Sequence, residues 1–277
     1  MRKKLVLLLI AVTVISCGCS KKEPVDLVLV EGRSAIAVSA GTNQDEPAIR
    51  DFYIGKHEVT QEEWTEVMGS NPSAFRGSHL PVESVSWYDS IEYCNKRSEK
   101  EGLAPYYKID KKVQDPDNIC DFDDIRWIVT VNEGANGYRL PTEAEWTYAA
   151  GGGLKSQNYT YSGSSDEEEA VWYWRNAGKE HLKGDWNWPD IETNQNKTHP
   201  VGIKKANELG IFDMSGNVRE WCYEWYEDTR IPKGFYRVWK GGGWVGDITS
   251  CKISYCGKFE PNGKGADMGI RVCRDRK

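Results

Sequence analysis

Helical periodicity occupies only a small part of this chain, which restricts the folds that it can adopt. A threonine with a glutamate three residues later opens two short segments, TQEEWTEVMG at Thr60 and PTEAEWTYAAGGG at Thr142. This spacing is typical of a capping box, in which the two residues exchange side-chain to backbone hydrogen bonds at a helix N-terminus. Because glycines follow both segments, each predicts a short helix that stops abruptly.

The rest of the chain predicts one more helix and many short strands. SWYDSIEYCNKRSEKEGL has Ser86 as its N-cap and places Trp87 and Cys94 on one side, so we interpret Cys94 as a small buried hydrophobic residue. VDLVLVEG and RDFYIGKHEV alternate and predict a hairpin or sheet edge. A long polar stretch with several tryptophans, residues 163–200, predicts a loop that is functional or packed on itself. We therefore expect one irregular α+β domain.

Composition supports a single core and weighs against one class of partner. The 277 residues include 12 tryptophans, and 39% are hydrophobic, which is enough for one sizeable domain. The formal charge of -6 gives no basic face for nucleic acid, so we expect none to bind. Eight cysteines are few for a disulfide scaffold of this length, and tryptophan rather than cystine should hold the fold.

The N-terminus reads as an export signal with a lipidation site. Basic residues precede an apolar run, which is followed by VISC, a pattern typical of a bacterial lipobox. We predict residues 1–19 as signal peptide, 20–27 as polar tether and 28–277 as the folded domain. Cys17 is the predicted lipid-bearing residue, Cys19 is the competing choice, and an ordinary secreted protein is the alternative. Lipidation would anchor the protein to the bacterial cell envelope, at its outer surface.

Oxygen-bearing side chains gather around NELGIFDMSGNVREW and predict a possible structural calcium site. Calcium prefers carboxylates, amide oxygens and carbonyls. The candidate ligands are Asn207, Asp213, Asn217 and Glu220. The alternative is that these groups cap turns.

Six segments occur in one order: IGKHEVTQEEW, PVESVSWYDSIEYCN, GYRLPTEAEWTYAAGGG, NELGIFDMSGNVREW, RVWKGGGW and GIRV. Together they resemble the formylglycine-generating enzyme-like (sulfatase-modifying factor) family over residues 28–274. The resemblance implies a C-type-lectin-like fold with small twisted sheets, two or three helices and bound calcium near GNVREW. It does not fix an activity, because the family contains both oxidases and non-catalytic binding proteins.

The resemblance gives the thiols of SCKISYC two interpretations. In the oxidases, a cysteine pair binds copper(I) and converts a sulfatase cysteine to formylglycine, and soft thiolates suit that metal. Cys251 and Cys256 would be that catalytic pair here. The flanking sequence departs from the oxidase pattern, since the arginine-rich frame is missing and Gly246 stands at the upstream cysteine. Cys251 is otherwise a scaffold residue that non-enzymatic relatives also keep.

Those relatives are the variable proteins of diversity-generating retroelements, and the chain resembles their lipid-anchored treponemal members. Their C-terminal region displays a diversified binding surface, which would correspond to residues 237–274. Aromatic side chains with small polar neighbours suit recognition. The predicted ligand-binding residues are Trp244, Val245, Gly246, Asp247, Thr249, Ser250, Ser254, Tyr255, Cys256, Phe259 and Asn262.

The sequence thus favours a monomeric, non-catalytic envelope protein that binds a protein or glycan ligand. A copper-dependent oxidase is the leading alternative. An envelope accessory protein that uses the fold only as an interaction scaffold is the third.

Overall fold

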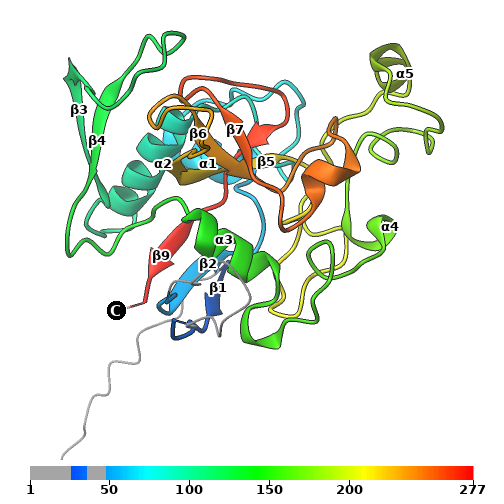
Figure 1. The fold of residues 1–277 in the computed structure, drawn as a ribbon, viewed down its shortest axis with the longest axis horizontal. Coiled ribbons are helices and arrows are strands. Elements are labelled where there is room, and N and C mark those ends of the chain that lie inside the picture. The colour runs from blue at the N-terminus through cyan, green and yellow to red at the C-terminus, as the bar shows by residue number, and fades with distance from the viewer. Residues whose placement is uncertain (1–25, 36–47, 277) are drawn as a thin grey trace, which may run out of the picture.

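The computed structural model describes residues 26–35 and 48–276 (Figure 1). The predicted signal peptide, Cys17, Cys19 and nearly all of the tether lie outside the described residues. Within the described ranges the chain forms an α+β domain of three small sheets, short helices and long loops, as the sequence predicts. No helix in these ranges is long and apolar enough to cross a membrane.

The first sheet joins the two ends of the described chain. β2 (Phe52–Gly55) lies between β1 (Leu27–Val30) and β9 (Cys273–Asp275), and both pairings are antiparallel. The pairing of β1 with β2 confirms the hairpin predicted from the alternating sequence. Figure 1 shows this sheet beside α3 (Glu143–Ala150).

The second sheet carries the C-terminal part of the chain. Its strand order is β7-β6-β5-β8, with β5 and β8 parallel and the other pairs antiparallel. The strands are β5 (Arg219–Trp225), β6 (Arg237–Lys240), β7 (Gly257–Phe259) and β8 (Met268–Gly269). The segment between β6 and β8 is therefore attached to the sheet at both ends.

A separate two-stranded hairpin projects at the opposite side of the molecule from α5 (Trp188–Thr193) (Figure 1). It consists of β3 (Tyr107–Gln114) and β4 (Trp127–Val131). Its strands are antiparallel, with a register shift between Asp110 and Gln114. Most of β3 beyond its first residue is exposed.

All three predicted helices form where their caps place them. Thr60 caps α1 (Gln61–Met68) and Thr142 caps α3, each through a complete capping box. Ser86 caps α2 (Trp87–Lys100), and Asp89 completes a third box there. The remaining helical turns are α4 (Glu167–Ala170), η1 (Gly153–Lys155) and η2 (Ile248–Cys251).

Tryptophan holds the core, as the composition predicts. Trp87, Trp146 and Trp221 are fully buried and lie in two neighbouring hydrophobic clusters. Rings of this size bury more apolar surface than any other side chain. Cysteines 94, 120, 222, 251, 256 and 273 are all free, and only Cys256 is not fully buried.

A buried ion pair joins the two larger sheets. Arg271 donates to Glu220 at 2.7 and 3.0 Å, and both side chains have no exposed surface. Glu220 also accepts from the Trp146 indole at 2.6 Å, while Arg271 donates to the Gly55 and Phe212 carbonyls. These bonds tie β2, α3 and β5 to the segment that precedes β9.

Removing this arginine should destabilise the whole domain. We expect Arg271→Leu to lower the free energy of unfolding by about 3 to 5 kcal/mol, because Glu220 would remain buried without a counter-charge. Arg276→Ala is the control: Arg276 and Asp51 are 45% and 43% exposed, so its loss should cost less than about 1 kcal/mol. Urea denaturation measures both, and equal effects would contradict this account.

Candidate functional site

The predicted ligand-binding segment forms a loop that is partly surface and partly core. Val245, Ser250, Cys256, Phe259 and Asn262 are half-buried. The exposed members of the predicted set are Asp247, Thr249, Ser254 and Tyr255. The exposed side chains are small polar groups and one tyrosine, a composition that suits recognition.

Local hydrogen bonds hold the polar part of this loop in shape. Asp247 caps η2, and its carboxylate accepts the Thr249 amide at 2.8 Å. The Ser250 hydroxyl donates to the Asp247 carbonyl at 2.6 Å. A ligand would therefore meet an ordered turn, which lowers the entropy lost on binding.

Trp244 does not lie on the surface, contrary to the sequence prediction. It is 4% exposed, donates its indole N–H to the Ala266 carbonyl at 2.8 Å and packs edge-on against Phe75. The reason is that it fills a third hydrophobic cluster, which Cys251 shares. Gly246 is also buried, and a Cβ there would lie 2.8 Å from the Ser250 hydroxyl oxygen. Neither position can present a side chain to a ligand in this conformation.

Phe259 and Asn262 are also engaged in the fold. The Phe259 ring stacks on Trp221 with centroids 6.2 Å apart. The Asn262 amide donates to the Phe122 carbonyl at 2.9 Å and to the Asp124 carboxylate at 3.0 Å. The surface available for a ligand thus centres on residues 245–255.

Two exposed tryptophans adjoin this surface, and the sequence analysis did not identify them as site residues. Trp186 and Trp188 are 50% and 46% exposed. The Trp186 indole donates to the Val245 carbonyl at 2.8 Å, and the Trp188 ring lies 6.4 Å from that of Trp244. The signal for them was DWNWP in the polar stretch, because two tryptophans with polar neighbours in the sequence have few apolar residues nearby to pack against. We call Trp186, Trp188 and residues 245–255 the tryptophan face.

The two thiols of SCKISYC lie in different environments. Cys251 belongs to the cluster around Trp244, whereas Cys256 packs against the cluster around Trp146 and lines a surface cavity. Burial raises the pKa of each thiol to about 12. A copper(I) site needs both thiols at one shared position, and side chains that pack into separate clusters are not arranged as such a pair.

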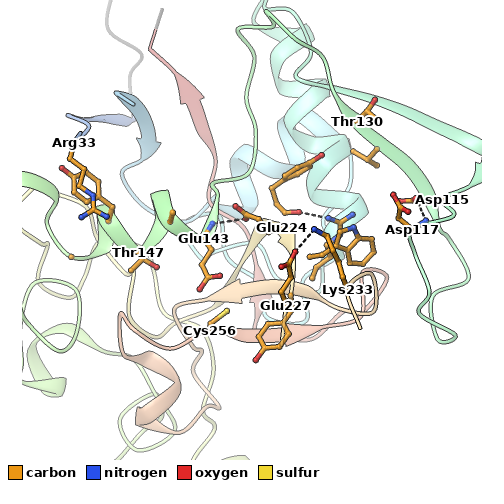
Figure 2. Close-up of a pocket in the computed structure, with 18 of the residues that line it drawn as sticks. Arg33, Asp115, Asp117, Thr130, Glu143, Thr147, Glu224, Glu227, Lys233 and Cys256 are labelled. Carbon is orange, nitrogen blue, oxygen red and sulfur yellow. Dashed lines mark hydrogen bonds and ion pairs between the residues drawn. The ribbon is translucent and has the colours of Figure 1, made fainter. Parts of the chain in front are cut away.

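The cavity beside Cys256 has a volume of about 1420 Å³. Its lining runs from Arg33 through Glu143 and Glu224 to Asp115 and Asp117 on the far side (Figure 2). α3, the end of β5 and the β3–β4 hairpin supply most of these residues. Its length suits an extended ligand better than a compact one.

Glu224 is the most perturbed acid in this lining. Burial raises its pKa to about 7, and the neighbouring Glu143 and Glu145 add to that effect. Its carboxylate accepts a hydrogen bond from the Glu143 amide at 3.0 Å. This N–H belongs to the first turn of α3 and therefore has no partner within the helix. Glu224 therefore changes charge near neutral pH at the centre of the cavity.

The four predicted calcium ligands have other partners in the structure. The amide oxygen of Asn207 accepts from the Leu209 and Ile211 amides, and that of Asn217 accepts from the His199 amide. Glu220 pairs with Arg271. In Asp213, one carboxylate oxygen accepts the Gly202 amide while the other has no partner.

Turn capping therefore accounts for both asparagines. No group of three or more His, Cys, Asp or Glu side chains in residues 26–35 and 48–276 is arranged to hold a metal ion. Calcium binding stays a prediction; of its four proposed ligands, Asp213 is the one that keeps a buried oxygen without a partner.

Comparisons with known proteins agree with this architecture. Residues 18–276 match the family described as the sulfatase-modifying factor enzyme 1-like domain. The chain belongs to this family. It is 57% identical over 280 residues to chaperone protein LppX of Paenibacillus barcinonensis, with 100% of both chains covered.

Two further relatives represent the two interpretations of the sequence. The formylglycine-generating enzyme of Streptomyces coelicolor is 30% identical over 162 residues, which cover 50% of this chain and 47% of that enzyme. Treponema denticola variable protein 1 has a TM-score of 0.68 and 32% identity, over 89% of this chain and 95% of that one. The predicted family, C-type-lectin-like fold and resemblance to treponemal variable proteins are confirmed.

Glu224 should make stability depend on pH. Its pKa is higher in the folded state than the ordinary value of 4.5, so its contribution to stability falls as pH rises from about 4.5 to about 7. We expect Glu224→Gln to raise the melting temperature relative to the native protein more at pH 8 than at pH 5. Glu227→Gln, an exposed carboxylate in the same lining, is the control. A difference for Glu224→Gln that does not change with pH would contradict the burial of this carboxyl.

Proposed function

We propose that this protein is an exported, lipid-anchored envelope protein that binds a partner polypeptide and acts on it as a chaperone. Its full-length similarity to a protein named as a chaperone supports the kind of activity. The export signal and lipobox support the location. The partner is another exported protein that reaches the same compartment.

The observation that carries the proposal is the exposure of Trp186 and Trp188 beside the loop of residues 245–255. A half-exposed indole offers a large apolar area. The bond of Trp186 to Val245 and the contact of Trp188 with Trp244 place both rings beside the start of the polar loop. Tryptophan and tyrosine dominate binding energy in protein interfaces. Such a surface suits apolar segments that an incompletely folded protein exposes.

A copper-dependent oxidase is not favoured. The buried Cys251 and the half-buried Cys256 lie in separate clusters, and the cavity that Cys256 lines does not include Cys251. Diversification of residues 237–274 by a retroelement is a separate prediction. The buried positions Trp244 and Gly246 would limit it to the exposed part of the loop.

The tryptophan face should be required for chaperone activity. We expect the native protein to suppress the aggregation of reduced, refolding lysozyme, measured by light scattering, and Trp186→Ala/Trp188→Ala to need at least about fivefold more protein for equal suppression. Val113→Ala is the matched control, because Val113 is 53% exposed but lies on β3, across the molecule. Undiminished suppression by the double variant would contradict the proposal. Binding of the native protein to a glycan array without any suppression would assign a glycan ligand instead.

Anchoring should depend on one cysteine. We expect Cys17→Ser to abolish incorporation of labelled palmitate and to release the protein from the membrane fraction, because the thiol carries the lipid. Cys19→Ser is the control and should remain labelled and membrane-bound. The reverse pattern would assign lipidation to Cys19, and labelling of neither native protein nor variant would contradict the anchor.

A further inference from the structure

A second surface, which starts at Cys256 where the tryptophan face ends in the chain and extends to β4, has the properties of a polypeptide-binding groove. The cavity of about 1420 Å³ adjoins another of about 740 Å³, and Ala144, Tyr223 and Glu224 line both. β4 borders both cavities, with Val129 in the lining of the first and Val131 in that of the second. We call the joined cavities the β4 groove.

The edge of β4 that faces the groove has open hydrogen-bonding groups. The Asn132 amide donates to the Tyr106 carbonyl at 2.7 Å, and the register pairs Thr130 with Lys108. Alternate residues of an antiparallel strand direct their backbone groups toward the partner strand. Thr130 therefore bonds to β3, while Val129 and Val131 turn their N–H and C=O groups away from it.

The opposite edge of the hairpin is closed at Tyr107, the residue that the register places opposite Val131. The Asn95 side chain of α2 bonds to both the N–H and the C=O of Tyr107 on β3, at 3.0 and 2.7 Å. No such partner meets the backbone groups of Val129 and Val131 among the described residues. An unpaired strand edge is a template for a further strand, and extended peptides bind other proteins in this way.

The lining of the groove contains more carboxylates than basic side chains. Each cavity is lined by five carboxylates and three basic side chains. Four of the basic side chains are already occupied: Arg139 pairs with Glu145, Arg276 with Asp51, Lys233 with Glu227, and Arg237 lies between the rings of Trp87 and Trp225. The carboxylates without an ion pair among the described residues are Asp115, Asp117, Glu133 and Glu224.

Aromatic rings supply the apolar part of the lining. Tyr148, Tyr223, Trp225 and Tyr226 line the larger cavity, and Tyr106 and Tyr107 line the smaller one. Rings beside carboxylates accommodate the aliphatic stem and the charged end of a lysine or arginine side chain.

We propose that the β4 groove binds an extended, lysine- or arginine-bearing segment of the partner polypeptide, which adds to the hairpin as a third strand beside β4. This inference rests on the proposed function, because it defines the chemistry of the partner polypeptide. The groove is nevertheless a different surface from the tryptophan face. Backbone pairing with Val129 and Val131 supplies sequence-independent affinity. Glu224 and its unpaired acidic neighbours select segments that carry positive charge.

Labelled decapeptides test the proposal by fluorescence anisotropy with the purified full chain. We expect the alternating threonine–lysine peptide to bind at least about tenfold more tightly than the alternating threonine–glutamate peptide, because opposite charge is favoured across the groove. Val131→Pro should weaken binding of the threonine–lysine peptide at least about tenfold, since proline removes the N–H that faces the groove. Val131→Ala keeps that N–H and should bind like the native protein.

Glu224→Gln separates charge from strand addition. At pH 8, where Glu224 is ionised, it should weaken binding of the threonine–lysine peptide by about threefold to tenfold and leave binding of an alternating threonine–glutamine peptide unchanged. In the native protein, the peptide should slow hydrogen exchange at the Val129 and Val131 amides more than at Thr130, whose amide already bonds to β3. This measurement needs no variant, so it remains decisive if Val131→Pro does not fold.

Three outcomes would overturn the inference. They are equal binding of the lysine and glutamate peptides, native affinity in a folded Val131→Pro variant, and unchanged exchange at Val129 and Val131. The double tryptophan variant distinguishes this failure from failure of the proposed function. Aggregation suppression that depends on Trp186 and Trp188, without peptide binding in the β4 groove, would leave the chaperone proposal standing and remove only the groove.

Discussion

The buried pair of Arg271 and Glu220 is the interaction on which the rest of the structure depends. Two charges without exposed surface are costly to bury unless every lone pair and N–H is satisfied. Here Arg271 bonds to two backbone carbonyls besides Glu220, and Glu220 takes the Trp146 indole. The requirement holds β2, α3 and β5 together, because these elements supply the Gly55 carbonyl, the Trp146 indole and Glu220.

That constraint explains how so much loop can be ordered. The segment of residues 241–267 starts at β6, pairs again as β7 and returns to the sheet at β8, which lies parallel to β5. Cys251 and Trp244 attach its middle to the third hydrophobic cluster. The loop therefore does not need disulfides to hold its shape, and its outer residues are free to vary without loss of the core.

Much of the fold could be predicted from local chemistry. The capping boxes at Thr60 and Thr142 fix the start of two helices within a few residues, and alternation located β1 and β2. These signals involve residues close together in the chain, so they can be recognised from the sequence alone. Whether Trp244 is buried or exposed cannot be predicted locally, because its burial depends on contacts with Phe75 and Ala266, which are not its neighbours in the chain. In the sequence, a buried aromatic residue of a recognition segment looks the same as an exposed one.

The candidate sites show the same limit. The five-residue spacing of Cys251 and Cys256 suggested a shared site, yet the 3-10 turn η2 and the following loop direct the thiols into different clusters. DWNWP carried a signal for Trp186 and Trp188, but only the bond of Trp186 to Val245 and the ring contact of Trp188 with Trp244 place them in a site. The open edge of β4 had no sequence signal. It depends on the register between β3 and β4, which decides the residues of β4 whose backbone groups point away from β3.

Under the proposed function, the tryptophan face and the β4 groove would make different demands on a bound polypeptide, and a chaperone would use both. Indole rings hold apolar side chains with little regard to sequence, whereas a strand edge holds any extended backbone. Neither demand requires a folded epitope, which distinguishes this pair of surfaces from an interface between folded proteins. The acidic lining would add selectivity, because it repels acidic segments. Another copy of this protein, with a net charge of -6, would be disfavoured as a partner for the same reason. A partner with a basic extended segment and an exposed apolar segment would bind both surfaces. A partner that has folded would expose neither kind of segment.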